Sequence, residues 1–195
     1  MRITIRKATP SDANFIALVM SEAINEGIMK RAEERLTDID KEMLSLLENT
    51  AKREDTLYSW THTFIAETAD KKVVGGIIAY DGSKYRKVRS LTFELLRNIL
   101  TFDPDTMDEE AHPGEFYLDS LAVLPDFRGK GIGRALIQHV CFMAKEIGMP
   151  TLLACHPENS SARRLYEDLG FQSSHTIHIF GENYLKMIKD KRTTY

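Results

Sequence analysis

The sequence predicts a single-domain protein of the α/β (α+β) class. Segments in which polar and apolar residues alternate, as in strands, are interspersed with segments whose apolar residues recur every three or four positions, as in helices. The chain has 195 residues, of which 43% are hydrophobic. This is enough for one core of ordinary size without a second domain, so we expect one domain over residues 1–195.

The first eighty residues predict a strand, two helices and a hairpin. The first helix begins near Thr9 and Pro10, because Thr is a good N-cap and Pro fits the first helical turn. A later, highly charged segment keeps apolar side chains at helical spacing. Two strand-like segments then turn back on each other near Asp70 and Lys71. We therefore expect a strand at 3–6, helices at about 9–23 and 31–53, and hairpin strands at 63–67 and 73–80.

An insertion at about 83–113 separates this hairpin from the next strand, where a short turn would suffice. Its first half, residues 84–100, has apolar side chains at helix-compatible spacing. We expect the insertion to contain its own helix. These apolar residues are Val88, Leu91, Leu95 and Ile99.

A glycine-rich turn links a strand at 116–124 to a helix that ends at Gly148. The turn reads Arg128-Gly129-Lys130-Gly131-Ile132-Gly133. Glycines at alternate positions leave the backbone N–H groups accessible to an anion, and the helix N-terminus adds a partial positive charge. Full positive charges come from Arg128, Lys130 and Arg134. The turn is therefore predicted to bind a pyrophosphate.

Three nucleotide-binding designs use such a turn, and the spacing of the glycines separates them. A P-loop is excluded because no Ser or Thr follows Gly129-Lys130. A dinucleotide-binding turn needs G-x-G-x-x-G and an acidic residue about 20 positions further on, and the best acid, Glu158, lies beyond a His-Pro break. The remaining design is R-x-x-G-x-G. With Arg128, Gly131 and Gly133 in those positions, the chain resembles the GNAT superfamily of acyl-CoA-dependent N-acetyltransferases, whose motif binds the pyrophosphate of coenzyme A.

A second segment carries the same resemblance. After a short strand at 151–155, residues 159–171 look like the family's N-x-x-A-x-x-x-Y-x-x-x-G-F pattern without a substitution. Physically this is a helix capped by Asn159 and ended by Gly170, with Phe171 starting the next strand. The two motifs span roughly a third of the chain. The resemblance implies a GNAT-like mixed, mostly antiparallel central sheet flanked by helices.

The resemblance also assigns functional residues. It implies that Tyr166 points at the sulfur of CoA and protonates the departing thiolate, although a tyrosine at this position could also be simple core packing. It implies that the strand ending near Val123 splays from its neighbour and that a backbone N–H there binds the oxyanion. It implies that Asn159 contacts pantetheine in addition to capping the helix, although capping alone would explain this residue. The cofactor-binding residues are then Leu121, Ala122, Val123, Arg128, Gly129, Lys130, Gly131, Ile132, Gly133, Arg134, Asn159 and Tyr166.

An amine must lose a proton before it attacks a thioester, so the site needs a base. Asp119 and Glu115 are the carboxylate candidates, and His112 is a weaker third. Asp119 is our candidate catalytic base, together with Tyr166 as the catalytic acid; the alternative is that Asp119 merely pairs with a neighbouring cation. By strand alternation, and unless a bulge intervenes, Asp119 should lie on the same side as Tyr117, Leu121 and Val123.

The second half of the insertion is an acidic run, with two interpretations. It is either a solvated loop or an acidic rim that attracts a cationic amine. The run consists of Asp103, Asp105, Asp108, Glu109 and Glu110.

Charge and cysteine content exclude several other classes. The net charge of −3 argues against a nucleic-acid partner, and the basic C-terminal residues are expected to be solvated: Lys186, Lys189, Lys191 and Arg192. No signal-peptide pattern or long apolar run is present, which predicts a cytoplasmic protein without a membrane partner. Cys141 and Cys155 lie within apolar elements, so we expect buried thiols and no metal.

Two functions remain. The first is transfer of an acetyl group from acetyl-CoA, as co-substrate, to a primary amine by direct attack in a ternary complex, because no cysteine is placed to carry the acyl group. The acceptor would be a small-molecule amine or an amine of a protein or peptide. The alternative is a noncatalytic acyl-CoA-binding module. A homodimer is common among proteins that resemble this chain.

Overall fold

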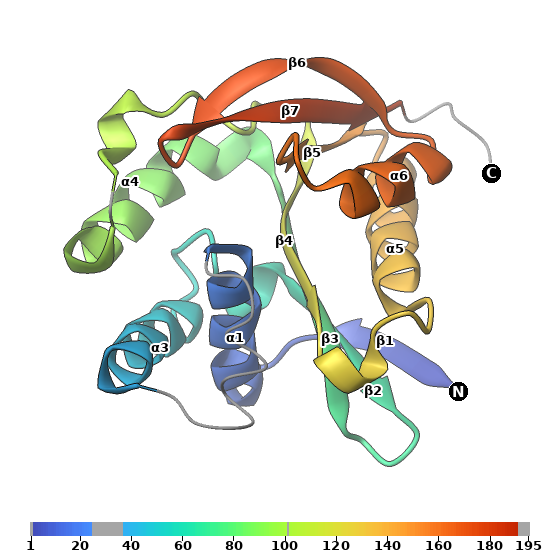
Figure 1. Cartoon of the computed structure of the whole chain (residues 1–195), viewed down its shortest axis with the longest axis horizontal. Coiled ribbons are helices and arrows are strands. Elements are labelled where there is room, and N and C mark those ends of the chain that lie inside the picture. Colours follow the sequence, from blue (N-terminus) through green and yellow to red (C-terminus); the bar gives the residue numbers. More distant parts are fainter. Residues whose placement is uncertain (1, 25–36, 101, 191–195) are drawn as a thin grey trace.

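The computed structural model describes residues 2–24, 37–100 and 102–190. Its strands form one seven-stranded sheet in the order β1-β2-β3-β4-β5-β7-β6 (Figure 1). All neighbouring strands are antiparallel except β4 and β5, which are parallel. The predicted mixed, mostly antiparallel sheet is confirmed. The strands are β1 (Ile3–Lys7), β2 (Thr63–Thr68), β3 (Val73–Asp81), β4 (Phe116–Val123), β5 (Thr151–Cys155), β6 (Gln172–Ile179) and β7 (Glu182–Lys189).

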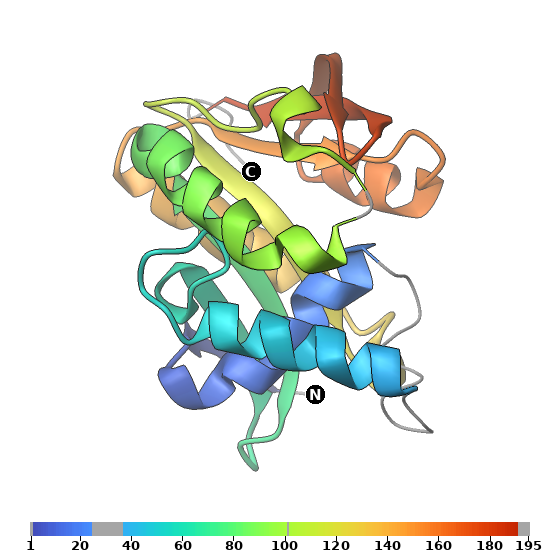
Figure 2. The same cartoon turned by 90° about the vertical axis from the view of Figure 1, so that its left-hand side faces the viewer.

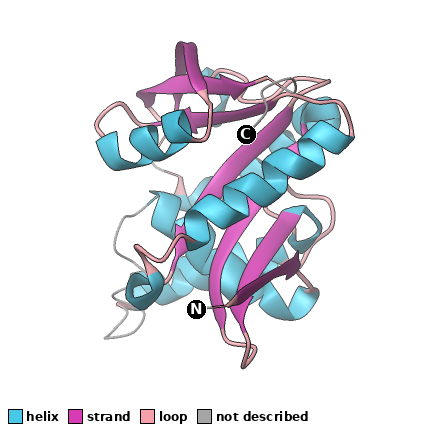
Figure 3. Cartoon of the chain, turned by 90° about the vertical axis from the view of Figure 1, so that its right-hand side faces the viewer, coloured by secondary structure: helices cyan, strands magenta, loops and turns pink. Residues whose placement is uncertain are grey.

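The described helices cover both faces of the sheet. One face carries α1 (Ala13–Ile24), α3 (Asp38–Ala51) and α4 (Tyr85–Leu96), which lie together in Figure 2. The other carries α5 (Ile132–Glu146), which crosses the sheet diagonally in Figure 3, and α6 (Ser160–Asp168). Each face therefore has its own apolar core: the first packs against α1 and α3, and the second against α5 and α6.

The predicted helices form where the sequence places their caps. The first begins with a short 3-10 turn, in which the N–H of Thr9 donates to Asp12 Oδ2 at 2.8 Å, and continues as α1. At the start of α3, Thr37 and Asp40 bond each other's backbone N–H groups reciprocally. The helix expected at about 31–53 is thus confirmed over α3, while residues 31–36 lie outside the described part of the chain. The helix expected in the insertion is confirmed as α4.

A β-bulge in β4 changes which side chains share a face. Ser120 lies opposite Ile78 of β3 and Leu118 lies opposite Ala79, so Asp119 has no partner there. Tyr117 belongs to the core under α1, where Asp119 also contacts Tyr80. Leu121 and Val123 pack instead in the core under α5. The expectation that Asp119 shares a face with Tyr117 is confirmed, and the expectation that it shares one with Leu121 and Val123 is wrong, because the extra residue reverses the alternation.

The basic C-terminal residues include two that are buried. Lys186 and Lys189 belong to β7 and are only 3% and 5% exposed. The Nζ of Lys186 lies 3.6 Å from Glu115 Oε2, and the Nζ of Lys189 donates to the carbonyl of Leu169 at 2.7 Å. The predicted solvated tail is wrong for these two residues, because their ammonium groups find partners inside the fold. Lys191 and Arg192 lie outside the described residues.

The insertion is anchored to the far edge of the sheet. The N–H of Asp108 donates to the carbonyl of His178 in β6 at 2.8 Å, and the N–H of His178 returns a bond to Asp108 Oδ2 at 2.7 Å. Cys141 and Cys155 are buried free thiols, as expected. None of the described helices has the length and apolar character needed to span a membrane.

Candidate active site

The glycine-rich turn forms the N-terminus of α5. Gly129 and Gly131 have φ angles of +71° and +80°, a left-handed conformation that other residues rarely adopt. A Cβ at either position would have no neighbour within 4 Å, so the turn faces open space. The first helical bond runs from the N–H of Ala135 to the carbonyl of Gly131. The preceding N–H groups have no carbonyl partner within the helix and can bind an anion. They belong to Ile132, Gly133 and Arg134.

Gly133 has a different role from the other two glycines. A Cβ there would lie 3.8 Å from the side chain of Leu121 and 3.9 Å from that of Val123. The first turn of α5 therefore rests directly on β4. This contact places the anion-binding N–H groups beside the end of that strand.

The three cations near the turn already contact protein groups. Arg128 donates to Glu22 Oε1 at 2.7 Å and to the carbonyl of Val123 at 2.9 Å. Lys130 Nζ donates to the carbonyl of Asp126 at 2.7 Å. Arg134 pairs with Asp168 at 3.0 Å, which ties α5 to α6. The Arg134–Asp168 pair is exposed, and exposed ion pairs contribute about 0–1 kcal/mol, so exchanging this contact for a pyrophosphate costs little.

Strands β4 and β5 separate next to this turn. Their pairing runs only from Phe116 to Leu118 on β4, whereas β4 stays paired with β3 as far as Val123. The splay implied by the resemblance is therefore present. Because the N–H of Leu124 donates to Val74 of β3, alternation directs the N–H groups of Leu121 and Val123 toward the side that β5 has left. A backbone donor at Val123 thus faces the gap.

Tyr166 on α6 combines packing with an available hydroxyl. Its ring packs edge-to-face on Phe171, with centroids 5.9 Å apart. Its hydroxyl forms no hydrogen bond with any described residue. Burial, and then the neighbouring Cys155 thiol, raise the pKa of Tyr166 to about 12. The residue therefore packs in the core under α5 and keeps a protonated hydroxyl at neutral pH.

Asn159 caps α6 as predicted. Its Oδ1 accepts from the N–H of Ala162 at 3.0 Å and from the hydroxyl of Ser161 at 3.1 Å. Both lone pairs of this oxygen are thus in use within the protein. A contact with pantetheine stays a prediction, and it would have to use the amide nitrogen.

Asp119 lies at the bulge, on the opposite side of the sheet from Tyr166. Its carboxylate accepts from the hydroxyl of Tyr80 at 2.7 Å and from that of Ser120 at 2.8 Å. Burial raises the pKa of Asp119, and the two hydroxyl hydrogen bonds oppose this rise. Within the described structure Asp119 has no cation partner, so the alternative that it merely pairs with a cation is wrong. A carboxylate with a raised pKa is suited to accept a proton near neutral pH.

The other two base candidates have structural contacts. Glu115 accepts from the backbone N–H of His112 at 2.9 Å and lies near Lys186. The His112 ring is half-exposed, with its Nδ1 at 3.3 Å from Glu109 Oε2. Among the three candidates, only Asp119 is buried with a raised pKa, and its role as the base stays a prediction.

Sequence reasoning did not find the residues that surround Asp119. Tyr80 ends the second hairpin strand and lies opposite Tyr117 of β4, so a register prediction for β3 and β4 would have brought it near Asp119. Ser120 is adjacent in sequence. Glu110 is only 3% exposed. Its burial could not be predicted from the sequence, because its neighbours in the acidic run are polar.

The acidic run is only partly exposed to solvent, and the attraction of a cationic amine by its exposed members stays a prediction. Asp103 and Asp105 are exposed, with Asp103 capping a short 3-10 turn. Asp108 bonds β6, as described above. Glu109 Oε1 pairs with Arg86 Nε at 2.6 Å, which lowers the pKa of Glu109. Glu110 points inward, so both interpretations are wrong for this residue.

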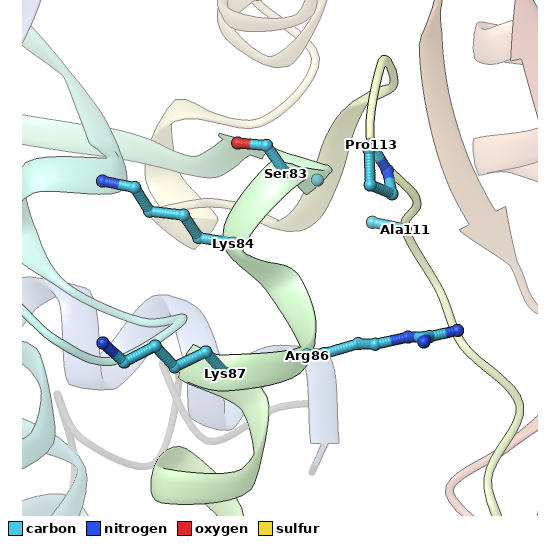
Figure 4. Close-up of a pocket in the computed structure, with 7 residues that line it drawn as sticks. Ser83, Lys84, Arg86, Lys87, Ala111 and Pro113 are labelled. Atoms are coloured by element: carbon cyan, nitrogen blue, oxygen red, sulfur yellow. The ribbon is translucent and has the colours of Figure 1, made fainter.

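A pocket of about 450 Å³ lies between the start of α4 and the segment around Ala111 (Figure 4). In Figure 4, Lys84 and Lys87 extend to one side of the helix and Arg86 extends to the other, toward that segment. The pocket contains none of the predicted site residues. It is lined by Gly82, Ser83, Lys84, Arg86, Lys87, Ala111 and Pro113.

Comparisons with known proteins agree with this geometry. The chain is 42% identical over 57 residues to a [ribosomal protein bS18]-alanine N-acetyltransferase of Haemophilus influenzae, a match that covers 29% of this chain and 39% of that protein. It thus spans about two-fifths of the length of that relative. An N-acetyltransferase from Staphylococcus aureus Mu50 superposes with a TM-score of 0.74 at 25% identity, covering 95% of this chain and all of that one. A crystal structure of an acetyltransferase superposes with a TM-score of 0.72 at 27% identity, covering 97% and 100%.

The model of the acetyltransferase (GNAT) family matches residues 29–171. This range contains the glycine-rich turn, the gap between β4 and β5, and the helix with Tyr166. The chain therefore belongs to the GNAT family of acetyltransferases.

Proposed function

We propose that this protein transfers an acetyl group from acetyl-CoA to a primary amine by direct attack within a ternary complex. The observation that carries the proposal is the gap between β4 and β5, with Tyr166 packed on one face of the sheet and Asp119 on the other face. The anion-binding turn of α5 lies at the same end of β4. Two substrates could therefore meet in the gap from opposite faces of the sheet.

Each part of the site has a role in this reaction. The N–H groups of the α5 turn bind the pyrophosphate of CoA, and the N–H of Val123 donates to the thioester oxygen as it becomes an oxyanion. Asp119 accepts the proton of the attacking ammonium, so that the nitrogen lone pair can form the new C–N bond. The C–S bond then breaks with its electron pair on sulfur, and the hydroxyl of Tyr166 donates a hydrogen bond to the departing thiolate. The nitrogen, which is now part of the amide, releases its second proton to solvent.

The pKa of Tyr166 limits what this residue can do. The phenol has a pKa of about 12, whereas a thiol has a pKa near ~8.5, so complete proton transfer is uphill by roughly 5 kcal/mol. A hydrogen bond to the forming thiolate needs no complete transfer and still stabilises the developing charge. The main role of Tyr166 is therefore to donate a hydrogen bond to the leaving group.

For the acceptor, we propose the N-terminal amine of a protein or peptide, with alanine as the first residue to test. Support comes from the relative in Haemophilus influenzae, whose name specifies an alanine of a ribosomal protein. A small-molecule amine is the competing acceptor class.

The test combines binding and turnover. Purified protein is mixed with acetyl-CoA and a peptide that begins with alanine, and mass spectrometry follows acetylation while thiol release is measured in parallel. A peptide with a blocked N-terminus is the matched control. We expect acetylation of the free peptide alone. Tight acetyl-CoA binding without acetylation of peptides, amino acids or polyamines would instead identify a noncatalytic acyl-CoA-binding module.

A further inference from the structure

A buried polar cluster lies on the Asp119 side of the sheet. Tyr80 is at its centre: its ring stacks on Tyr85 with centroids 6.3 Å apart and lies 5.9 Å from Tyr117. Its hydroxyl donates to Asp119, as described above. The hydroxyl of Tyr85 in turn accepts from the backbone N–H of Glu110 at 3.2 Å. The insertion therefore places a second carboxyl group, that of Glu110, near the proposed base Asp119.

The side chain of Glu110 lacks a protein partner. The residue is 3% exposed, yet no described residue forms a hydrogen bond or an ion pair with its carboxylate. Burial, and then the charge of Asp119, raise the pKa of Glu110 well above its ordinary value. An isolated buried carboxylate costs several kcal/mol, so native proteins seldom keep one without a use.

The cations nearest to Glu110 have other partners. Among the described residues, the charge of Asp119 raises the pKa of Glu110, and the charges of Arg89 and Lys186 lower it. Lys186 is already near Glu115, and Arg89 donates one bond to the carbonyl of Pro104 at 2.6 Å. The Nε of Arg89 is buried without a hydrogen-bond partner. The raised pKa of Glu110 favours the neutral carboxyl group in the free protein, and a cation placed beside it would stabilise the ionised form.

We propose that Glu110 binds the ammonium group of the acceptor beside Asp119 and makes the site selective for cationic amines. This inference rests on the proposed function, in which Asp119 is the base. Glu110 holds the ammonium while Asp119 takes one of its protons, and the neutral amine then attacks. The rings of Tyr80, Tyr85 and Tyr117 are buried beside these carboxyl groups, and a charge interaction is stronger in such surroundings than in water.

The experiment measures binding without turnover. Calorimetry is done in the presence of CoA, which carries no acetyl group, with a tripeptide amide that begins with alanine. A second peptide replaces this alanine by lactic acid, which changes the ammonium into a hydroxyl. Glu110→Gln removes the charge and keeps the shape, and Glu109→Gln is the matched control in the neighbouring, Arg86-paired position.

We expect the wild type to bind the alanine peptide at least about tenfold more tightly than the lactic-acid peptide, which corresponds to ~1.4 kcal/mol. Glu110→Gln should lose this difference, whereas Glu109→Gln should keep it. The affinity for acetyl-CoA should be unchanged in both variants. The melting temperature of Glu110→Gln should not fall, because the amide removes a buried unpaired charge.

The proposal is overturned if Glu110→Gln binds the alanine peptide as the wild type does, or if the wild type binds neither peptide or both equally. Acetylation that survives Glu110→Gln with an unchanged KM would overturn it as well and would leave the proposed function standing. Binding that depends on Glu110 and on the ammonium, without acetylation by the wild type, would support this inference and contradict the proposed function.

Discussion

Replacing Tyr80 by Phe removes one of the two hydroxyl hydrogen bonds to Asp119, over a distance of 2.7 Å. A hydrogen bond to a charged group contributes about 1.5–3 kcal/mol, and this one stabilises the ionised carboxylate and therefore lowers the pKa of Asp119. Since one pKa unit corresponds to about 1.36 kcal/mol, its loss should raise that pKa by about 1 to 2 units. The base must be ionised to accept a proton, so activity in the variant should fall off at a higher pH.

The assay is the pH dependence of kcat at saturating acetyl-CoA and peptide. This parameter reports groups of the bound complex, so ionisation of the free amine does not enter. We expect the acidic limb of Tyr80→Phe to move to higher pH by about 1 to 2 units. Ser120→Ala should move it in the same direction, because it removes the other bond, of 2.8 Å. Tyr117→Phe is the control, since no hydrogen bond links Tyr117 to Asp119. If the acidic limb of the pH profile stays at the wild-type pH in both Tyr80→Phe and Ser120→Ala, Asp119 is not the base.

Three further predictions test other parts of the molecule. Gly131→Asp should weaken acetyl-CoA binding in calorimetry at least about tenfold more than Gly131→Asn, which has the same shape without the charge; equal affinities would remove the turn from the binding site. Tyr166→Phe should lower kcat on the order of a hundredfold with little change in acetyl-CoA affinity, and unchanged turnover would reduce Tyr166 to a packing residue. Lys189→Met should lower the free energy of unfolding in urea by about 1–2 kcal/mol, because the carbonyl of Leu169 loses its buried donor; an unchanged value would mean that the carbonyl finds another donor.

Features of this protein that depend on neighbouring residues can be predicted from the amino-acid sequence alone. The glycine-rich turn needs left-handed backbone at Gly129 and Gly131, and the helix that carries Tyr166 needs the cap at Asn159. Both signals lie within a few residues of the structure they specify. The alternation of strands and helices is equally local, so it predicted the class of fold and most element positions. The strand β7 was missed, because its alternation is interrupted by lysines.

The arrangement of residues on the proposed acceptor side depends on contacts that form only in the folded protein. A single bulge reverses the alternation of β4, so the face on which Asp119 lies could not be extrapolated along the strand. Tyr80 reaches Asp119 from 39 positions earlier in the chain. The burial of Glu110 and Lys186 depends on the insertion, β7 and the sheet packing together. Burial and the pKa shifts that follow from it are set by contacts between distant segments, and residue type and spacing within one segment do not specify those contacts.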